Sequence, residues 1–486
     1  MLFAAGAEGG QATISLDECL RIALSQNPNI EIEKIDYINA VKNITVEKSV
    51  FDPDFSTGFS YADSKRPTSS VVTGNRRKTT EFQIGYGGLI SNGDSYGLSL
   101  SQVKSNTNSQ SSSLNPSYTM DITLDYTKPL FRGRGRDVTL SRLRITKLNS
   151  EISGLQLKAE VMDIASQVES AYWGLVYARE NLKVKDESLR LANETLSRTK
   201  AMVEAGAMAD SQVLLVEAQA ASREEDVIEA EGEVRKAVLE LKLVMNVGTE
   251  SELWAKEIAP GGPGVEEVEF ELLPFDDGMK TALANRPDYL GVSKNLEVRE
   301  VETTAARNRV RPSVDLVSSV GVGGLQGEYS ASLQDVTSLQ YPSWEVGLWM
   351  ELPVGRREAR ARLEQSVNNE KKAGLEIDKA VKTIAVELAG AEVTLQTARK
   401  KMEAAKVTRE YAEQKLKEEE EKHILGLATT HDVLEYQEDL EIARLSESRA
   451  IVDFNESVTS YYYLLGTLLE QKGIEIAEDR LNIFQQ

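Results

Sequence analysis

One segment of this chain occurs twice, 259 residues apart, and this repeat constrains the fold more than any other feature. Residues 16–29 (LDECLRIALSQNPN) match residues 275–288 (FDDGMKTALANRPD), and the same offset places Pro53 on Pro312. A repeat of this length indicates two copies of one structural plan. We therefore predict repeat 1 over 12–250, a linker over 251–274, repeat 2 over 275–470 and a C-terminal tail over 471–486.

Apolar side chains recur every seven residues through long stretches of both repeats. The first series is Val161, Val168, Leu175, Leu182, Leu189, Leu196 and Val203 in repeat 1, and Val367, Val381, Leu388, Leu395, Met402 and Leu416 in repeat 2. A second series beside it is Ile164, Ala171, Ala178 and Ala192 in repeat 1, interrupted by Lys185, and Ile377, Ile384, Ala391, Ala398, Ala405 and Ala412 in repeat 2. This period predicts long helices that pack as coiled coils. The expected helices cover 15–50, 137–204 and 211–247 in repeat 1, and 275–311, 356–423 and 431–469 in repeat 2. Each of the longest would span roughly 100 Å.

Between the first and second helix of each repeat the pattern changes to alternation of apolar and polar residues, over 53–130 and 312–354. Pro53, Pro129, Pro312 and Pro353 mark the changes. Runs of about ten alternating residues are typical of strands that cross a membrane in a β-barrel. Trp344 and Trp349 would then belong to an aromatic girdle at the membrane interface. A soluble β-sandwich with one wet face is the alternative, and the long polar loops expected over 63–78, 105–117 and 323–342 favour the barrel.

The first β segment is longer than the second. It has 75 residues between Asp54 and Lys128, against 39 between Ser313 and Glu351. The surplus matches two additional strands joined at Asn92-Gly93, a pair common in tight hairpin turns. We expect six strands per chain, with a flap over 79–104 outside the barrel wall as the alternative.

Both transitions from strand to long helix are basic, with Arg132 and Arg134 at the first and Arg356 and Arg357 at the second. Positive side chains are unfavourable at the N-terminus of a helix, so another partner is required. We expect phospholipid headgroups at the membrane interface to be this partner.

The composition excludes several classes of function. The net charge of −21 argues against a nucleic-acid partner. With two histidines and one cysteine, no catalytic constellation, metal-ligand set or cofactor motif is present in the sequence, so we expect no enzyme activity, no metal and no cofactor. Residues 1–11 include Ala5-Gly6-Ala7, which is typical of the end of a secretory signal, and we expect a signal remnant or a disordered tail there.

The two repeat openings and residues 426–435 (GLATTHDVLE) resemble the TolC-like outer-membrane efflux proteins, the outer membrane factor family. The resemblance covers nearly the whole chain. It implies a mixed α and β fold in which three copies close one transmembrane β-barrel, continued by a periplasmic α-helical coiled-coil barrel. It also implies a bacterial outer-membrane location, and as partners a periplasmic adaptor and an inner-membrane pump.

The resemblance also assigns functional residues. Asp432 and Glu435 correspond to the acidic residues that ring the pore constriction, and solvated charges at a helix tip are the alternative. The tips that would dock on the adaptor comprise Gly206, Ala207, Ser211, Gln212, Gly426, Leu427, Thr429 and Thr430. Gln212 departs from the family, which often has at this position an acid that holds neighbouring coils together.

The implied function is the outer-membrane channel of a tripartite pump that exports small molecules or drugs from the periplasm or cytoplasm. The duct of a type I protein secretion system is an alternative with the same architecture. A structural coiled-coil scaffold with a soluble β-domain is an alternative of another class, and it would need no detergent for extraction.

Overall fold

The computed structural model describes residues 11–69, 72–206, 208–261 and 267–474. These residues form two compact units. The first contains the described parts of Met1–Tyr37, Ser153–Gly291 and Ile377–Gln486, and the second contains those of Ile38–Ile152 and Val292–Glu376. Each unit takes segments from both repeats, so the compact units cut across the repeats. The expected signal remnant lies outside the described residues except for Gln11, and so does most of the expected tail.

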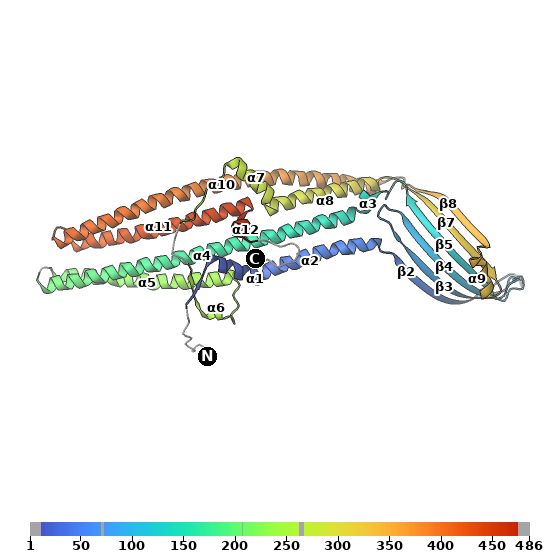
Figure 1. Cartoon of the computed structure of the whole chain (residues 1–486), viewed down its shortest axis with the longest axis horizontal. Helices are drawn as coiled ribbons and strands as arrows, with labels where there is room; N and C mark the ends of the chain where they lie inside the picture. Colours follow the sequence, from blue (N-terminus) through green and yellow to red (C-terminus); the bar gives the residue numbers. More distant parts are fainter. Residues whose placement is uncertain (1–10, 70–71, 207, 262–266, 475–486) are drawn as a thin grey trace. The chain divides into compact units, whose positions relative to one another are not determined.

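Two helical hairpins carry the seven-residue pattern: α4 (Ser141–Glu204) with α5 (Asp210–Val244), and α10 (Arg357–Ile424) with α11 (Thr430–Leu465) (Figure 1). Near each hairpin turn a glycine adopts positive φ, +72° at Gly206 and +76° at Gly426. Glycine reaches this left-handed conformation without steric cost and therefore ends the helix before each turn.

Two helices that we expected to be single are each divided at a proline. The range 15–50 contains α1 (Leu16–Gln26) and α2 (Pro28–Lys48), and 275–311 contains α7 (Phe275–Asn285) and α8 (Pro287–Arg309). The preceding residues, Asn27 and Arg286, have ψ of 122° and 118°. Proline disfavours helical conformation in the residue before it, so the prediction of single helices was wrong.

Shorter elements connect these helices. The expected linker contains α6 (Glu252–Ala255) and strand β6 (Glu257–Pro260), which pairs in parallel with β1 (Gln11–Ile14). The other short elements are η1 (Ser49–Phe51), α3 (Arg136–Thr139) and α12 (Leu468–Gln471). Among the described residues, no helix has both the length and the apolar character that crossing a bilayer requires.

The helical core follows the seven-residue pattern only in part. Val161, Val168 and Leu175 are fully buried, whereas Leu182 is only partly buried. Farther along α4 the buried positions are Val184, Ser188, Ala192, Thr195 and Thr199. These residues lie on an adjacent stripe, and several of them are polar. Ala192 and Thr199 continue the second seven-residue series, whose members Ile164, Ala171 and Ala178 are also buried. The buried side of α4 therefore follows both series at first and only the second one farther along.

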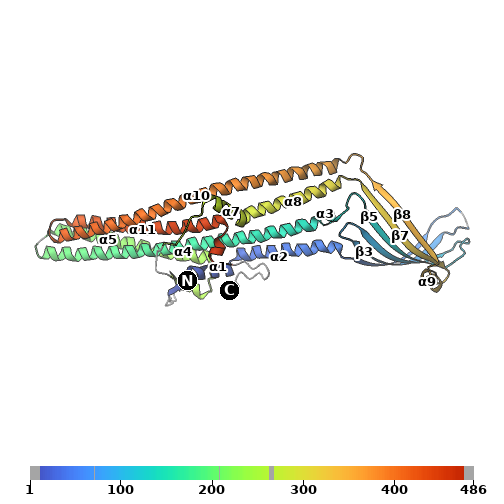
Figure 2. The ribbon, with the colours of Figure 1, turned by 45° about the horizontal axis from the view of Figure 1, so that its top comes forward.

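The second unit contains one antiparallel sheet with the strand order β2-β3-β4-β5-β7-β8 (Figure 1). The strands are β2 (Asp54–Lys65), β3 (Arg76–Leu89), β4 (Ser95–Thr107), β5 (Ser117–Pro129), β7 (Ser313–Gln326) and β8 (Tyr341–Glu351). The additional hairpin β3–β4 is thus internal to the sheet, and the alternative of an external flap is wrong. The expected loop 323–342 contains helix α9 (Tyr329–Thr337), which lies at the strand ends far from α3 and α8 (Figure 2).

Candidate functional site: sheet faces, strand–helix junction and hairpin tips

The sheet has one apolar and one polar face, and both faces extend over all six strands. Cross-strand partners lie on the same face of a sheet, and the register joins Phe59 to Phe82, Ile84 to Leu100, Leu98 to Leu124, Ile122 to Val322, and Val320 to Trp344. The opposite face carries Ser56, Ser60, Glu81, Gln83, Ser99, Ser101, Asp121, Thr123, Asp125, Ser319, Ser343 and Glu345. This distribution is typical of transmembrane barrel strands, with lipid on one face and water on the other.

The two tryptophans of β8 do not share a face. They are five positions apart in a continuously paired strand, so their side chains point to opposite faces of the sheet. Nε1 of Trp349 lies 3.2 Å from where a Cβ on Gly347 would be, which places it on the face of that glycine. Trp344 is 79% exposed and lies on the apolar face. Trp344 and Trp349 therefore cannot both belong to one lipid-facing girdle, and Trp344 is the one on the apolar face.

A network around Asn308 fixes the strand–helix junction. Asn308 is 6% exposed, and its Oδ1 accepts a hydrogen bond of 2.8 Å from the backbone amide of Gly133. The backbone amide of Arg132 donates to the carbonyl of Pro312 at 3.3 Å. The turn of the additional hairpin joins this network, because the amide of Gly135 donates to the carbonyl of Asn92 at 2.9 Å.

The predicted interface residues occupy different parts of this junction. Arg132, Pro353, Arg356 and Arg357 line one hollow, whereas Arg134 is exposed and lies outside it. The other two prolines contact the additional hairpin: Pro129 lies near Gly93, and Pro53 lies near Gly88.

At the second hairpin tip, Asp432 takes part in a capping box. Its Oδ2 accepts hydrogen bonds from the backbone amide of Thr429 at 2.8 Å and from the Thr429 hydroxyl at 2.7 Å, and its own amide donates back to that hydroxyl at 3.2 Å. These bonds lower the pKa of Asp432, so the carboxylate stays ionised. Glu435 is exposed. The pattern Thr-x-x-Asp could have indicated this capping role from the sequence.

Both hairpin tips expose apolar side chains. Leu425 and Leu427 are 73% and 76% exposed on the second tip, and Leu214 is 71% exposed near the first. Of the other predicted tip residues, Ser211 and Thr429 are exposed, Gln212 is half-buried and Thr430 is buried. Ala207 lies outside the described residues.

The two histidines flank the second tip without forming a metal site. Nδ1 of His423 lies 3.0 Å from the carbonyl oxygen of Ala428, which ties the end of α10 to the turn. Across the part of the chain that the structure describes, no group of three or more His, Cys, Asp or Glu side chains could hold a metal ion.

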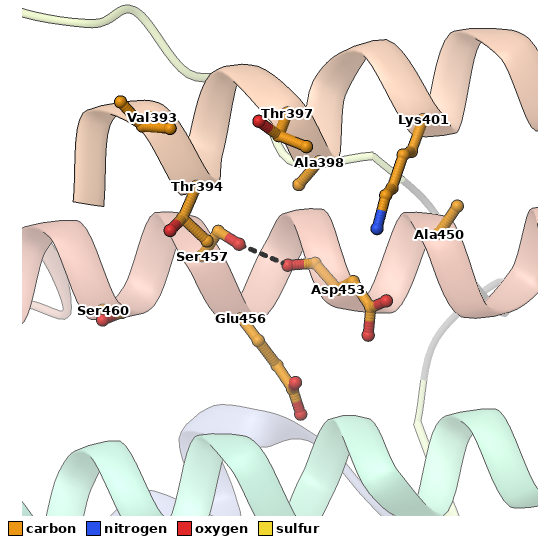
Figure 3. Close-up of a pocket in the computed structure, with 10 residues that line it drawn as sticks. All are labelled: Val393, Thr394, Thr397, Ala398, Lys401, Ala450, Asp453, Glu456, Ser457 and Ser460. Atoms are coloured by element: carbon orange, nitrogen blue, oxygen red, sulfur yellow. Dashed lines mark hydrogen bonds between the residues drawn. The ribbon is translucent and has the colours of Figure 1, made fainter. Parts of the chain in front are cut away.

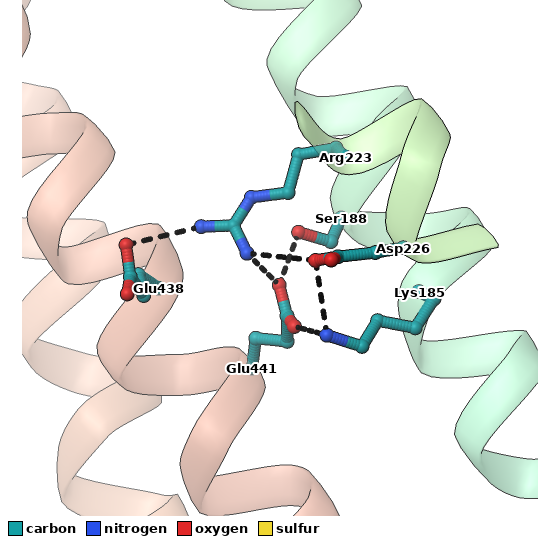
Figure 4. Close-up of polar contacts among 6 residues, drawn as sticks. All are labelled: Lys185, Ser188, Arg223, Asp226, Glu438 and Glu441. Atoms are coloured by element: carbon teal, nitrogen blue, oxygen red, sulfur yellow. Dashed lines mark hydrogen bonds and ion pairs between the residues drawn. The ribbon is translucent and has the colours of Figure 1, made fainter. Parts of the chain in front are cut away.

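A cluster of charged side chains joins the two hairpins, and the sequence analysis did not identify it (Figure 4). Glu441 of α11 is 4% exposed, and it accepts hydrogen bonds from Ser188 Oγ at 2.6 Å, from Arg223 Nη1 at 2.7 Å and from Lys185 Nζ. Oδ2 of Asp226 lies 3.1 Å from Nζ of Lys185, and Oε2 of Glu438 lies 3.2 Å from Nη2 of Arg223. Lys185 falls in the second seven-residue series, between Ala178 and Ala192, and a charged residue in this apolar series was the available signal for a buried polar contact.

A second hollow, of about 490 Å³, lies between α10 and α11 (Figure 3). Its lining includes Lys401, Asp453 and Glu456, and it contains neither histidine nor cysteine. Burial raises the pKa of Glu456, whose Oε1 accepts a hydrogen bond of 3.4 Å from Ser170 of α4. This bond connects α11 with α4.

Comparison with known proteins agrees with this geometry. The sequence model of the family described as outer membrane efflux protein matches residues 95–247 and 278–467. No curated protein sequence matches the chain significantly.

Solved structures of the same fold include the outer-membrane channel OprN, with 17% identity, a TM-score of 0.66, and coverage of 93% of this chain and 90% of that chain. The Campylobacter jejuni CmeC outer membrane channel has 18% identity and a TM-score of 0.64, with coverage of 93% and 86%. The open state of the Neisseria gonorrhoeae MtrE outer membrane channel has 17% identity and a TM-score of 0.64, with coverage of 93% and 89%. At such identities the structures show the fold, while the family match extends over more than half of the chain. The chain therefore belongs to the outer membrane efflux protein family, the TolC-type channels.

Proposed function

We propose that this chain forms the outer-membrane channel of a tripartite efflux pump that exports small molecules from the periplasm or the cytoplasm. The observation that carries the proposal is the apolar face that continues across all six strands of the sheet. Outside a membrane such a face would be exposed to water, whereas in a barrel wall it contacts lipid and the polar face lines the channel.

The two edges of the sheet support closure by further copies of the chain. Strand β2 has 12 residues, β8 has 11, and their other edges are unpaired within the described residues. Long unpaired edges favour pairing with another strand. Because the strand number is even, β8 of one copy would lie antiparallel to β2 of the next. Three copies would close a barrel of eighteen strands, wider than a barrel built from four strands per copy.

Helix α10 offers a second surface for such assembly. Val386, Val393 and Val407 lie at multiples of seven residues and are 73%, 65% and 47% exposed. Exposed apolar residues at this spacing are typical of a coiled-coil face without its partner helix. A neighbouring copy would cover this face.

We propose that the exposed leucines of the hairpin tips dock on a periplasmic adaptor, and that Glu435 and Asp432 narrow the channel there. The capping role of Asp432 is compatible with the second role, because its carboxylate remains charged and its Oδ1 makes no hydrogen bond among the described contacts. Three copies would bring six carboxylates together near the symmetry axis.

Reconstitution tests the proposal. The protein should need detergent for extraction, should measure as a trimer by light scattering, and should produce discrete conductance steps in planar bilayers. A detergent-free monomer without conductance would contradict it and would favour the structural scaffold.

A further inference from the structure

A basic hollow lies where strands β5, β7 and β8 meet the helices of the second unit. Its volume is about 830 Å³, and its lining includes Arg132, Arg309, Arg311, Arg356 and Arg357. They come from three separate segments: the residues after β5, the end of α8 with the residues that follow it, and the start of α10 with the residue before it. This concentration of cations is unexpected in a chain with a net charge of −21.

Nearby carboxylates do not neutralise this charge. Within the described parts of the chain, Arg132, Arg309, Arg311 and Arg357 form no ion pair. The two carboxylates in the lining form ion pairs with other arginines, Glu302 with Arg299 at 2.9 Å and Glu358 with Arg362 at 2.8 Å. Guanidinium groups placed close together repel one another, so an anionic partner would stabilise this arrangement.

The hollow is fixed by the backbone of the junction. The Asn308 network holds the residues after β5 against the end of α8. On the other side, Nη1 of Arg356 donates to the carbonyl of Val310 at 3.4 Å. Arg356 has a φ of +43°, a conformation that is unfavourable for residues other than glycine. Such strained conformations persist only where the surrounding contacts compensate for their cost, and they are common at functional sites.

We propose that the hollow binds the phosphate group of an anionic phospholipid. Guanidinium groups bind phosphate through paired hydrogen bonds, and several of them can surround one phosphate. The location favours a lipid over a free anion, because the hollow adjoins the strand ends where the apolar face begins with the pair Val314 and Met350. A lipid with its phosphate among the arginines could place its acyl chains along that face. The proposal rests on the outer-membrane location of the proposed function.

Native mass spectrometry of the full chain in detergent tests the proposal. The test variant is R309Q/R311Q, and Arg311→Gln alone is a milder version. The matched control is R307Q/K371Q, which removes two exposed cations that lie outside the hollow and have no ion pair among the described residues. We expect wild type and control to bind phosphatidylglycerol in preference to phosphatidylcholine. Binding of phosphatidylglycerol to the double variant should be roughly 25-fold weaker, since each basic side chain near an anionic lipid contributes about fivefold.

Three results would overturn the proposal. Equal losses in variant and control would indicate general surface charge. Equal binding of inorganic phosphate, with no preference for phosphatidylglycerol, would identify a free anion as the ligand. Dissociation of the oligomer with unchanged lipid binding would indicate that the arginines pair with carboxylates of a second copy. Conductance in planar bilayers separates a failure of the lipid site from a failure of the proposed function. If one of these results is obtained and the protein still forms channels, only the lipid site is refuted. If the protein forms no channels in any bilayer, the proposed function is refuted.

Discussion

Replacement of Glu441 by glutamine should loosen the contact between the two helical hairpins. The substitution preserves the shape of the side chain and removes the charge that faces Lys185 and Arg223 (Figure 4). Arg223 has a side-chain exposure of only 9%, so water cannot readily replace the lost partner.

The size of the effect follows from the remaining contacts. Removing one member of a buried ion pair costs roughly 3–5 kcal/mol, because the other charge stays buried without a partner. Here Asp226 remains 3.1 Å from Lys185, and Glu438 remains 3.2 Å from Arg223. We therefore expect the lower end of the range, about 3 kcal/mol.

Hydrogen exchange measured by mass spectrometry can detect this change locally. A loss of about 3 kcal/mol should accelerate exchange in peptides of α5 and α11 around the cluster by roughly a hundredfold. The matched control is Glu187→Gln, which removes an exposed pair with Arg190 at 2.6 Å and should change exchange less than about fivefold. Similar exchange rates in the two variants would refute the buried-cluster argument. If the cluster also holds the channel closed, Glu441→Gln should increase conductance in planar bilayers.

Four further predictions follow from the described contacts. Partial burial lowers the pKa of Lys185, but its bonds to Glu441 and Asp226 raise the pKa above the usual 10.5. The stability that Lys185 adds to the folded state should therefore persist below pH 10.5 and be lost as the pH rises through the higher folded-state pKa. Hydrogen exchange near the cluster should then accelerate, after correction for the intrinsic exchange rates. The double substitution D432N/E435Q should reduce cation preference in planar bilayers, whereas unchanged selectivity would place these carboxylates away from the constriction. Val393→Glu should weaken the trimer in light scattering if a neighbouring copy covers that face, with Arg399→Gln, on the same helix, as an exposed control. Density for the barrel in cross-section should contain eighteen strands, and twelve would refute six-strand closure.

Local sequence rules predicted much of the fold, because they rest on periodicity. Alternation identified the strands, including β3 and β4, since each strand places one side chain in two on the apolar face. The hairpin turns were recognisable from Gly206 and Gly426. The breaks before Pro28 and Pro287 could have been predicted from the same rules, but continuity of the surrounding helical pattern obscured them.

The contacts between distant segments were harder to infer. Glu441 meets Lys185 and Ser188 across more than 250 residues of sequence, and no local pattern indicates that pairing. The arginine-lined hollow also depends on contacts between distant segments, because Arg132, Arg309 and Arg356 come from three strand–helix junctions. The sequence showed two basic junctions, but it did not reveal that the end of α8 completes one cavity with them.

Asp432 illustrates why a residue assignment by resemblance needs the local geometry beside it. The resemblance assigned this carboxylate to a pore constriction, and the structure places it in the cap of α11 through bonds to Thr429. These roles use different properties of the group: the cap uses the lone pairs of Oδ2, whereas a constriction would use the negative charge. Because the same bonds lower the pKa of Asp432, the cap would help keep a constriction charged as the pH falls. Glu435 makes no such bond among the described contacts, so substituting it tests the constriction without disturbing the start of the helix.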